Sequence, residues 1–280
     1  DRLLMAQITS FIRWAGGKSW LIPFVQDLIQ DLDYNNYFEP FMGGASIFFS
    51  LERKNKCFLS DVNDELVNAF IEVRDHVNDV ISYMKDYNTD SDSYYQIRDL
   101  EPTEPAEKAA RFLYLNATSF NGLYRVNKLG KYNVPYGQRC VSLNYDRLTE
   151  ASQKLDNAEL SCQDFDAVRD VLHQGDLIFL DPPYAVTKGE NGFLGYNAKF
   201  FSLEDQYRLG KLIDYINDVG SYYILTNAAH SIIEEIFASR GRMISLERNS
   251  LIGGKQAFRG KIQEYIFTNI PERSIEHGAN

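Results

Sequence analysis

The tetrapeptide Asp181-Pro182-Pro183-Tyr184 follows an apolar run, residues 177–180, that is expected to form a buried strand. A carboxylate and a fixed carbonyl can together hold both hydrogens of an exocyclic amino group. Consecutive prolines restrict φ and so fix the direction of the carbonyl of Pro182. The nitrogen lone pair would then point toward an electrophile, and the Tyr184 ring would stack on the base. These residues predict methyl transfer to an amino nitrogen, with Asp181, Pro182 and Tyr184 as catalytic residues.

The alternative is that this tetrapeptide is only a rigid turn, since short motifs also match by chance. Its place at the carboxyl end of a strand favours the catalytic interpretation, because open α/β sheets bind ligands at that edge.

A second candidate site is a glycine turn near the N-terminus. Residues 37–46 predict a short strand, a turn at Gly43 and Gly44, and a helix through Leu51. Glycines allow the backbone to approach a ligand closely. Their spacing differs from that of dinucleotide-binding loops, so no phosphate cradle is implied.

The next strand, expected over residues 56–59, leads to Asp61. An acid at a strand end can hold a ribose diol. It can equally cap a following helix, here one beginning near Asn63. The neighbouring glycine turn favours the ribose interpretation.

Trp14 and Lys18 bracket a further glycine loop, ahead of a helix whose apolar residues recur from Trp20 to Leu32. A glycine loop at a helix N-terminus can accept an anion, and a carboxylate would fit.

In this order, the motifs resemble those of Dam-type DNA adenine-N6 methyltransferases, the α-class amino methyltransferases. The similarity is greatest to the GATC modification methylases of DpnII-like systems and spans roughly residues 10–270. It rests on the segments 13–18, 38–44, 60–63, 121–127, 132–137, 181–184 and 259–262.

The resemblance implies S-adenosyl-L-methionine as cofactor. Its contacts would be Trp14, Lys18, Phe41, Gly43, Gly44, Asp61 at the ribose, Asp164 and Phe165 at the adenine, and Asp181. Asp164 and Phe165 also follow an apparent strand, residues 160–162, and an acid beside an aromatic ring suits an adenine edge and face.

The formal net charge of −10 is unfavourable for binding DNA phosphates. Residues 61–107, however, hold 13 acids and 3 Lys or Arg, so the remainder of the chain is neutral. Residues 117–145 and 248–263 are basic and contain no acid. Each basic segment taken alone could be an ordinary solvated face; beside a methyl-transfer motif, both favour phosphate contact.

The first basic segment also predicts a β-hairpin, with strands 124–127 and 131–134 joined by a turn. A two-stranded ribbon fits the major groove, where Arg125 could bind a guanine and Leu123 or Val126 a thymine methyl. Phe120 and Asn121 lie where related enzymes insert side chains beside the target base; a core Phe and a turn Asn are the alternative. The predicted DNA-binding residues are Phe120, Asn121, Leu123, Arg125, Lys128, Arg139 and Arg259.

The fold class expected is α/β, a doubly wound, mostly parallel Rossmann-like sheet with an antiparallel last strand and a helical and β-hairpin recognition insert. Helices are expected near 63–86, 106–116, 202–218 and 230–239, and strands near 176–181, 221–226, 242–247 and 262–269. The catalytic domain would comprise residues 1–86 and 143–280, and the target-recognition domain residues 87–142.

Cys57, Cys140 and Cys162 lack the spacing of a disulfide framework or a zinc site, and we expect no metal. No apolar run reaches membrane-spanning length and no signal peptide is evident, which predicts a cytoplasmic protein bound to DNA. We expect a monomer, with a cognate restriction endonuclease as a candidate partner.

The predicted reaction is methylation of adenine N6 in double-stranded DNA, within GATC. The target base would be flipped out of the helix, since its amino group is inaccessible in the stack. Residues 185–201 would form a lid or, alternatively, an ordinary surface loop. The alternative functions are methylation of an amino nitrogen in RNA or protein, and non-catalytic DNA binding.

Overall fold

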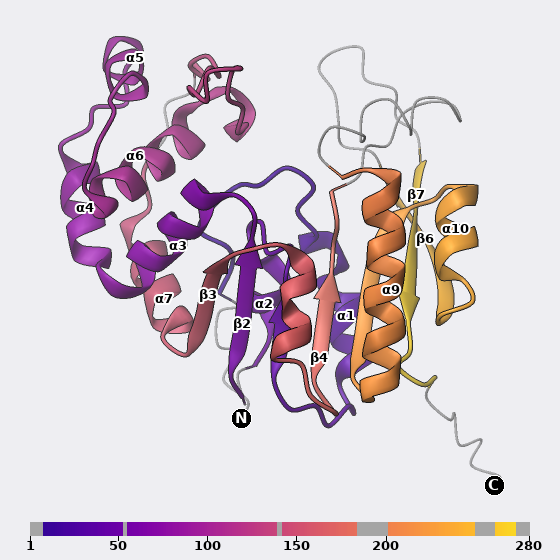
Figure 1. Ribbon diagram of the computed structural model, residues 1–280. Coiled ribbons are helices and arrows are strands. Elements are labelled where there is room, and N and C mark those ends of the chain that lie inside the picture. The colour runs from indigo at the N-terminus through magenta and orange to yellow at the C-terminus, as the bar shows by residue number, and fades with distance from the viewer. Residues whose placement is uncertain (1–7, 53–54, 139–141, 184–200, 250–260, 273–280) are drawn as a thin grey trace, which may run out of the picture. The chain divides into compact units, whose positions relative to one another are not determined.

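The computed structural model describes residues 8–52, 55–138, 142–183, 201–249 and 261–272 (Figure 1). Within these residues, a seven-stranded sheet has the order β3-β2-β1-β4-β5-β7-β6. The strands are β1 (Tyr37–Glu39), β2 (Cys57–Asp61), β3 (Ala158–Cys162), β4 (Leu177–Leu180), β5 (Tyr222–Ala228), β6 (Arg242–Asn249) and β7 (Lys261–Thr268). The pairs β2–β3, β1–β4 and β4–β5 are parallel, and β7 is antiparallel to β5 and β6. The predicted mostly parallel sheet with an antiparallel last strand is confirmed.

The sequence did not indicate that β7 inserts between β5 and β6. Burial explains the order: Ile266 and Phe267 are both 0% exposed although they face opposite sides of the sheet. A strand buried on both faces suits the interior of a sheet. In β6, partly buried residues alternate with exposed ones such as Met243, as befits an edge strand.

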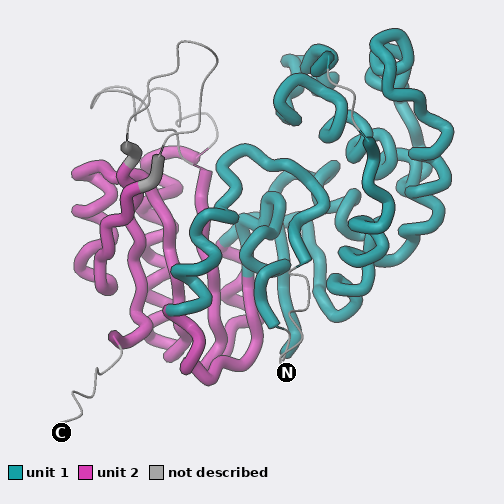
Figure 2. The backbone as a smooth tube through the Cα atoms, turned by 180° about the vertical axis from the view of Figure 1, so that it is seen from behind, with its two compact units in different colours: residues 1–27, 39–165 teal, residues 28–38, 166–280 magenta. Residues whose placement is uncertain are grey.

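The chain divides into two compact units, shown in teal and magenta in Figure 2. Unit 1 comprises residues 1–27 and 39–165, and unit 2 comprises residues 28–38 and 166–280. The recognition segment 87–142 belongs entirely to unit 1. Its independence as a domain stays a prediction.

Unit 1 contains most of the helices. They are η1 (Ser19–Leu21), most of α1 (Ile22–Ile29), α2 (Ser46–Ser50), α3 (Asp64–Asp75), α4 (Val77–Lys85), α5 (Ser91–Arg98), α6 (Pro105–Thr118), η2 (Phe120–Gly122) and α7 (Tyr145–Leu155). Helix α6 is the centre of this group, because α3, α4 and α5 all pack against it. A cluster of Tyr94, Ile97, Tyr114 and Leu115 forms the core where α5 meets α6.

Three helical features of unit 1 differ from the sequence prediction. The single helix expected over 63–86 breaks at His76, whose φ of −136° is not helical. Helix α5 was not among the predicted helices; Asp90 caps it and it buries Tyr94 and Ile97. Helix α7 was not predicted either; the side chain of Asn144 caps it.

Unit 2 contains most of β1, strands β4 to β7, most of η3 (Phe165–Asp170), and the helices α9 (Leu203–Val219) and α10 (Ser231–Phe237). All four residues of β4 are buried. Helix α9 packs against β5 and α10. It starts with a capping box between Ser202 and Asp205, and it ends at Gly220, whose φ of 82° favours glycine.

The N-terminus of α3 provides a test of this local structure. Asn63 Oδ1 accepts a hydrogen bond from the Leu66 amide at 3.1 Å. Asn63→Ala removes this acceptor, and we expect the free energy of unfolding to fall by about 0.5–2 kcal/mol in urea denaturation. Asn63→Asp keeps an acceptor and is the control. Equal losses in the two variants would contradict a capping role.

Candidate functional site

Asp61, at the carboxyl end of β2, holds two backbone amides with its carboxylate. Oδ2 accepts from the Gly43 amide and Oδ1 from the Asn63 amide, each at 3.1 Å. The cap of α3 is Asn63, so the alternative that Asp61 caps this helix is wrong. Burial raises the pKa of Asp61 above its ordinary value, although the bonds from Asn63 and Gly43 act in the opposite direction. A carboxylate kept in a site that disfavours its charge is typical of functional positions.

The glycine turn is shaped to receive the Trp14 ring. A Cβ at Gly43 would lie 2.7 Å from Trp14 Cδ1, and Gly43 has a φ of +47°. A Cβ at Gly44 would lie 3.2 Å from Ser10 Oγ, a tight contact, and at an ordinary contact distance of 3.5 Å from Trp14 Cβ. Gly43 therefore requires glycine and Gly44 has little room for a side chain. The structure brings Trp14, Gly43, Gly44 and Asp61 together.

Lys18 lies in the same loop as Trp14. Its side chain is buried, and Nζ donates to the Gly16 carbonyl at 2.8 Å. The Gly17 amide closes the loop by donating to the Trp14 carbonyl at 3.1 Å. The ammonium group is thus held against the backbone of this loop.

Phe41 and Phe165 stack with ring centroids 5.2 Å apart. Their contact joins the start of the glycine turn to the segment after β3. Asp61 pairs in register with Cys162, and the Gln163 amide donates to the Asp61 carbonyl at 3.0 Å. The ends of β2 and β3 thereby bring Asp164, which is exposed, and Phe165 to the same edge of unit 1 as Asp61.

Asp181 belongs to unit 2 and directly follows β4. Its Oδ1 accepts a hydrogen bond from Thr226 Oγ1 at 2.7 Å, and Pro182 is buried. Tyr184 lies outside the described residues. Sequence reasoning missed Thr226, although a signal was present: Thr226 and Asn227 are polar residues at the end of an apolar strand, as Asp181 is.

The segment that precedes the predicted hairpin is exposed. Phe120 is 49% and Leu123 40% exposed, so the alternative of a core position for Phe120 is wrong. Asn121 is exposed in a left-handed turn conformation, with a φ of 55°. Asn121 thus occupies the turn position that the alternative interpretation gave it, and its role in DNA binding stays a prediction.

The predicted hairpin is present, but without the full strands 124–127 and 131–134. Val126 and Tyr132 form an antiparallel bridge, and the Asn127 amide donates to the Lys131 carbonyl at 2.8 Å. Lys128 is exposed at the tip. Arg139, Arg259, the expected lid except Phe201, and most of the second basic segment lie outside the described residues.

Asn133 holds Arg125 across this hairpin. Arg125 Nε donates to Asn133 Oδ1 at 2.7 Å, and Nη2 donates to the Asn133 carbonyl at 3.1 Å. Two bonds from one guanidinium restrict its rotation. The side chain predicted to contact a base is therefore already oriented by its own hairpin.

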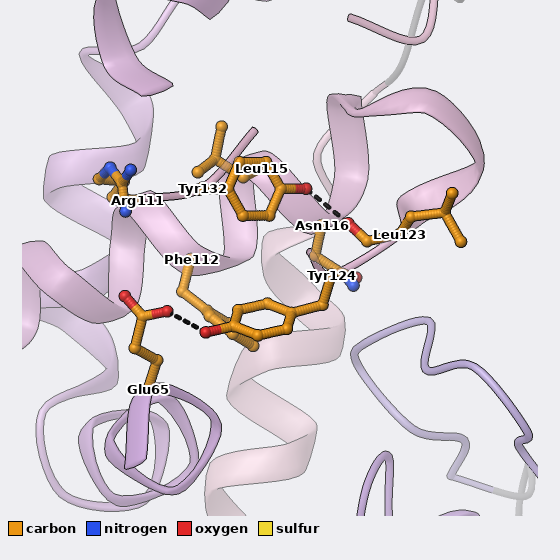
Figure 3. Close-up of a pocket in the computed structure, with 8 residues that line it drawn as sticks. All are labelled: Glu65, Arg111, Phe112, Leu115, Asn116, Leu123, Tyr124 and Tyr132. Carbon is orange, nitrogen blue, oxygen red and sulfur yellow. Dashed lines mark hydrogen bonds between the residues drawn. The ribbon is translucent and has the colours of Figure 1, made fainter. Parts of the chain in front are cut away.

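Figure 3 shows how the base of the hairpin is anchored within unit 1. Tyr124 Oη donates to Glu65 Oε2 at 2.5 Å, and Tyr132 Oη donates to the Leu123 carbonyl at 2.6 Å. Burial, followed by the bond to Glu65, raises the pKa of Tyr124, so the hydroxyl stays protonated as the donor. The surrounding small pocket is lined by Glu65, Arg111, Phe112, Leu115, Asn116, Leu123, Tyr124 and Tyr132.

Residues at the base of the hairpin also contact the loop that carries Trp14. The ring centroids of Trp14 and Tyr124 lie 5.6 Å apart. The buried Asn116 amide accepts from the Arg13 backbone at 3.0 Å and donates to the Arg13 carbonyl at 2.6 Å. The loop with predicted cofactor contacts and the hairpin with predicted DNA contacts are thus held by the same residues.

In the described part of the chain, no group of three or more His, Cys, Asp or Glu side chains could hold a metal ion. None of its helices combines the length and the apolar character needed to cross a membrane.

Comparison with known proteins identifies the family. Residues 14–251 match the D12 class N6 adenine-specific DNA methyltransferases. The type II methyltransferase M1.LlaDCHI of Lactococcus lactis subsp. cremoris is 32% identical over 271 residues, covering 92% of this chain and 94% of that protein. A DNA adenine methylase of Haemophilus influenzae is 31% identical over 268 residues, covering 91% and 92%. The family match extends over most of the chain, and the protein therefore belongs to the D12 class of N6 adenine-specific DNA methyltransferases.

Proposed function

We propose that the protein transfers a methyl group from S-adenosyl-L-methionine to adenine N6 in double-stranded DNA, within GATC. The observation that carries the reaction is the Asp181 carboxylate, fixed by Thr226 at the end of β4 and followed by two prolines. The family match favours DNA over RNA or protein as the substrate. It also argues against a DNA-binding relative without activity.

The cofactor assignment is supported by the residues around Asp61. The chain would hold S-adenosyl-L-methionine with Trp14, Lys18, Phe41, Gly43, Gly44, Asp61, Asp164 and Phe165. Asp61 fits a ribose diol, because a carboxylate has about four acceptor positions, more than its backbone amides occupy. When bound, the cofactor supplies an electrophilic methyl group on a sulfonium.

The chain's own contribution to the methyl transfer is orientation. The Asp181 carboxylate accepts one hydrogen of the adenine amino group and the Pro182 carbonyl accepts the other, which turns the nitrogen lone pair outward. Positioning of this kind can supply about 7–11 kcal/mol of a barrier in favourable cases. No covalent bond between enzyme and base is required.

We assign recognition of the DNA sequence to the hairpin and to the exposed segment that precedes it, residues 120–123. A guanidinium can make two hydrogen bonds to a guanine in the major groove, and Arg125 is presented on a narrow ribbon. GATC as the recognition sequence rests on the resemblance of the motifs. A cognate restriction endonuclease and a monomeric state stay predictions.

Tritiated methyl transfer, followed by mapping of modified bases, tests the proposed reaction. We expect label on adenine in duplexes that contain GATC. Asp181→Ala should abolish transfer while leaving cofactor and DNA binding largely intact, because its carboxylate acts mostly in the transition state. Near-wild-type turnover of this variant would exclude the catalytic role of Asp181. Label on another base would contradict the proposed function.

Asp61→Ala tests the cofactor site. Loss of a charge-assisted hydrogen bond should weaken cofactor binding by about 1–3 kcal/mol in calorimetry. Asp64→Ala removes the same charge from an exposed position nearby and is the matched control. Equal cofactor affinity in wild type and Asp61→Ala would assign Asp61 to folding alone.

Arg125→Ala tests the reading of bases. We expect discrimination at one base pair to relax by about 1–3 kcal/mol, measured as kcat/KM on the preferred site and its single-base variants. Lys128→Ala should instead weaken binding to all sequences alike and reduce its salt dependence. An equal fall on every sequence for Arg125→Ala would make Arg125 a phosphate contact.

A further inference from the structure

Thr226 lies beside Asp181 because of the register between two parallel strands. Leu180 of β4 pairs with Leu225 of β5, so the next residues along the two strands are Asp181 and Thr226. Neighbouring residues in register point to the same face of a sheet. Thr226 is 0% exposed, so its hydroxyl is shielded from bulk solvent.

The Thr226 hydroxyl has two acceptors within reach. Its Oγ1 lies 2.7 Å from Asp181 Oδ1 and 3.5 Å from the Leu180 carbonyl oxygen. A hydroxyl has a single proton to donate, and 2.7 Å is the usual length of an O–H···O bond. The shorter of the two contacts therefore directs the proton of Thr226 to Asp181.

We infer that Thr226 is a positioning residue for Asp181 in the methyl-transfer reaction, an inference that rests on the proposed function. Threonine is stiff at χ1, so the donor itself is held in place. Fixing Oδ1 fixes the plane of the whole carboxylate and with it the direction of Oδ2. That direction decides whether the carboxylate meets an amino hydrogen along its N–H bond.

Hydrogen bonds on the opposite face of β5 also hold the backbone of Thr226 in place. The Asn227 side chain donates to Gln206 Oε1 of α9 at 2.9 Å and accepts from the Ala228 amide at 2.9 Å. These bonds hold the end of β5 from the face away from Asp181. The Thr226 backbone is therefore fixed independently of its hydroxyl.

Three variants separate positioning from packing. Thr226→Val keeps the shape and removes the donor, whereas Thr226→Ser keeps the donor and removes a methyl group. Thr268→Val is the matched control, because Thr268 is also 0% exposed but donates to the Tyr223 carbonyl, at 2.6 Å. Each variant is compared with wild type for kcat, for KM of DNA and of cofactor, and for thermal stability.

We expect Thr226→Val to lower kcat roughly ten- to hundred-fold, as for loss of a hydrogen bond to a charged group. Both KM values should stay within about two-fold, since positioning acts in the transition state. Thr226→Ser should retain most of the wild-type kcat, and Thr268→Val should lose stability without this fall in kcat.

The inference is overturned if Thr226→Val keeps wild-type kcat while Asp181→Ala is inactive; the proposed function then stands. It is also overturned if Thr226→Ser loses as much kcat as Thr226→Val, or if Thr268→Val does so, because packing would then explain the effect. Wild-type activity in both Asp181→Ala and Thr226→Val would overturn the proposed catalytic role of Asp181 together with this inference.

Discussion

The hydrogen bonds that the amides of Gly43 and Asn63 donate to the Asp61 carboxylate are the constraint on which the rest of unit 1 depends. The bond from the Gly43 amide holds the glycine turn against the end of β2. The bond from the Asn63 amide fixes the backbone of Asn63, the residue that caps α3. The turn then receives the Trp14 ring, and α3 carries Glu65 toward Tyr124. A single half-buried carboxylate thus fixes the loop that would contact the cofactor and the helix that supports the hairpin.

Asn116 and Tyr124 extend this arrangement to the recognition segment. Asn116 pairs with the Arg13 backbone as a neighbouring strand would, which fixes the residue before Trp14. Tyr124 contributes a ring beside Trp14 and a hydroxyl on Glu65. Buried amides and hydroxyls are costly unless they are paired, so such fully bonded contacts specify one arrangement of loop and hairpin.

Short segments of the sequence were sufficient to predict the features that depend only on residues adjacent in the chain. The runs 56–59 and 177–180 predicted strands because most of their residues are apolar, and Asp61 and Asp181 stood out as the acids that follow. The position of β7 and the partner of Asp181 depend on which strands become neighbours and in which register, which no short segment encodes. The break at His76 escaped prediction because the residues on both sides of it favour a helix.

The two carboxylates are held in different ways, and the difference follows from what each would do. Asp61 is bound by backbone amides, which cannot be changed by substitution and which occupy fewer than its roughly four acceptor positions. Asp181 is bound through one oxygen by a stiff side chain, which fixes the direction in which the other oxygen points. The first arrangement suits tight binding of a diol. The second suits alignment of one N–H bond, where an error in angle weakens the contact steeply.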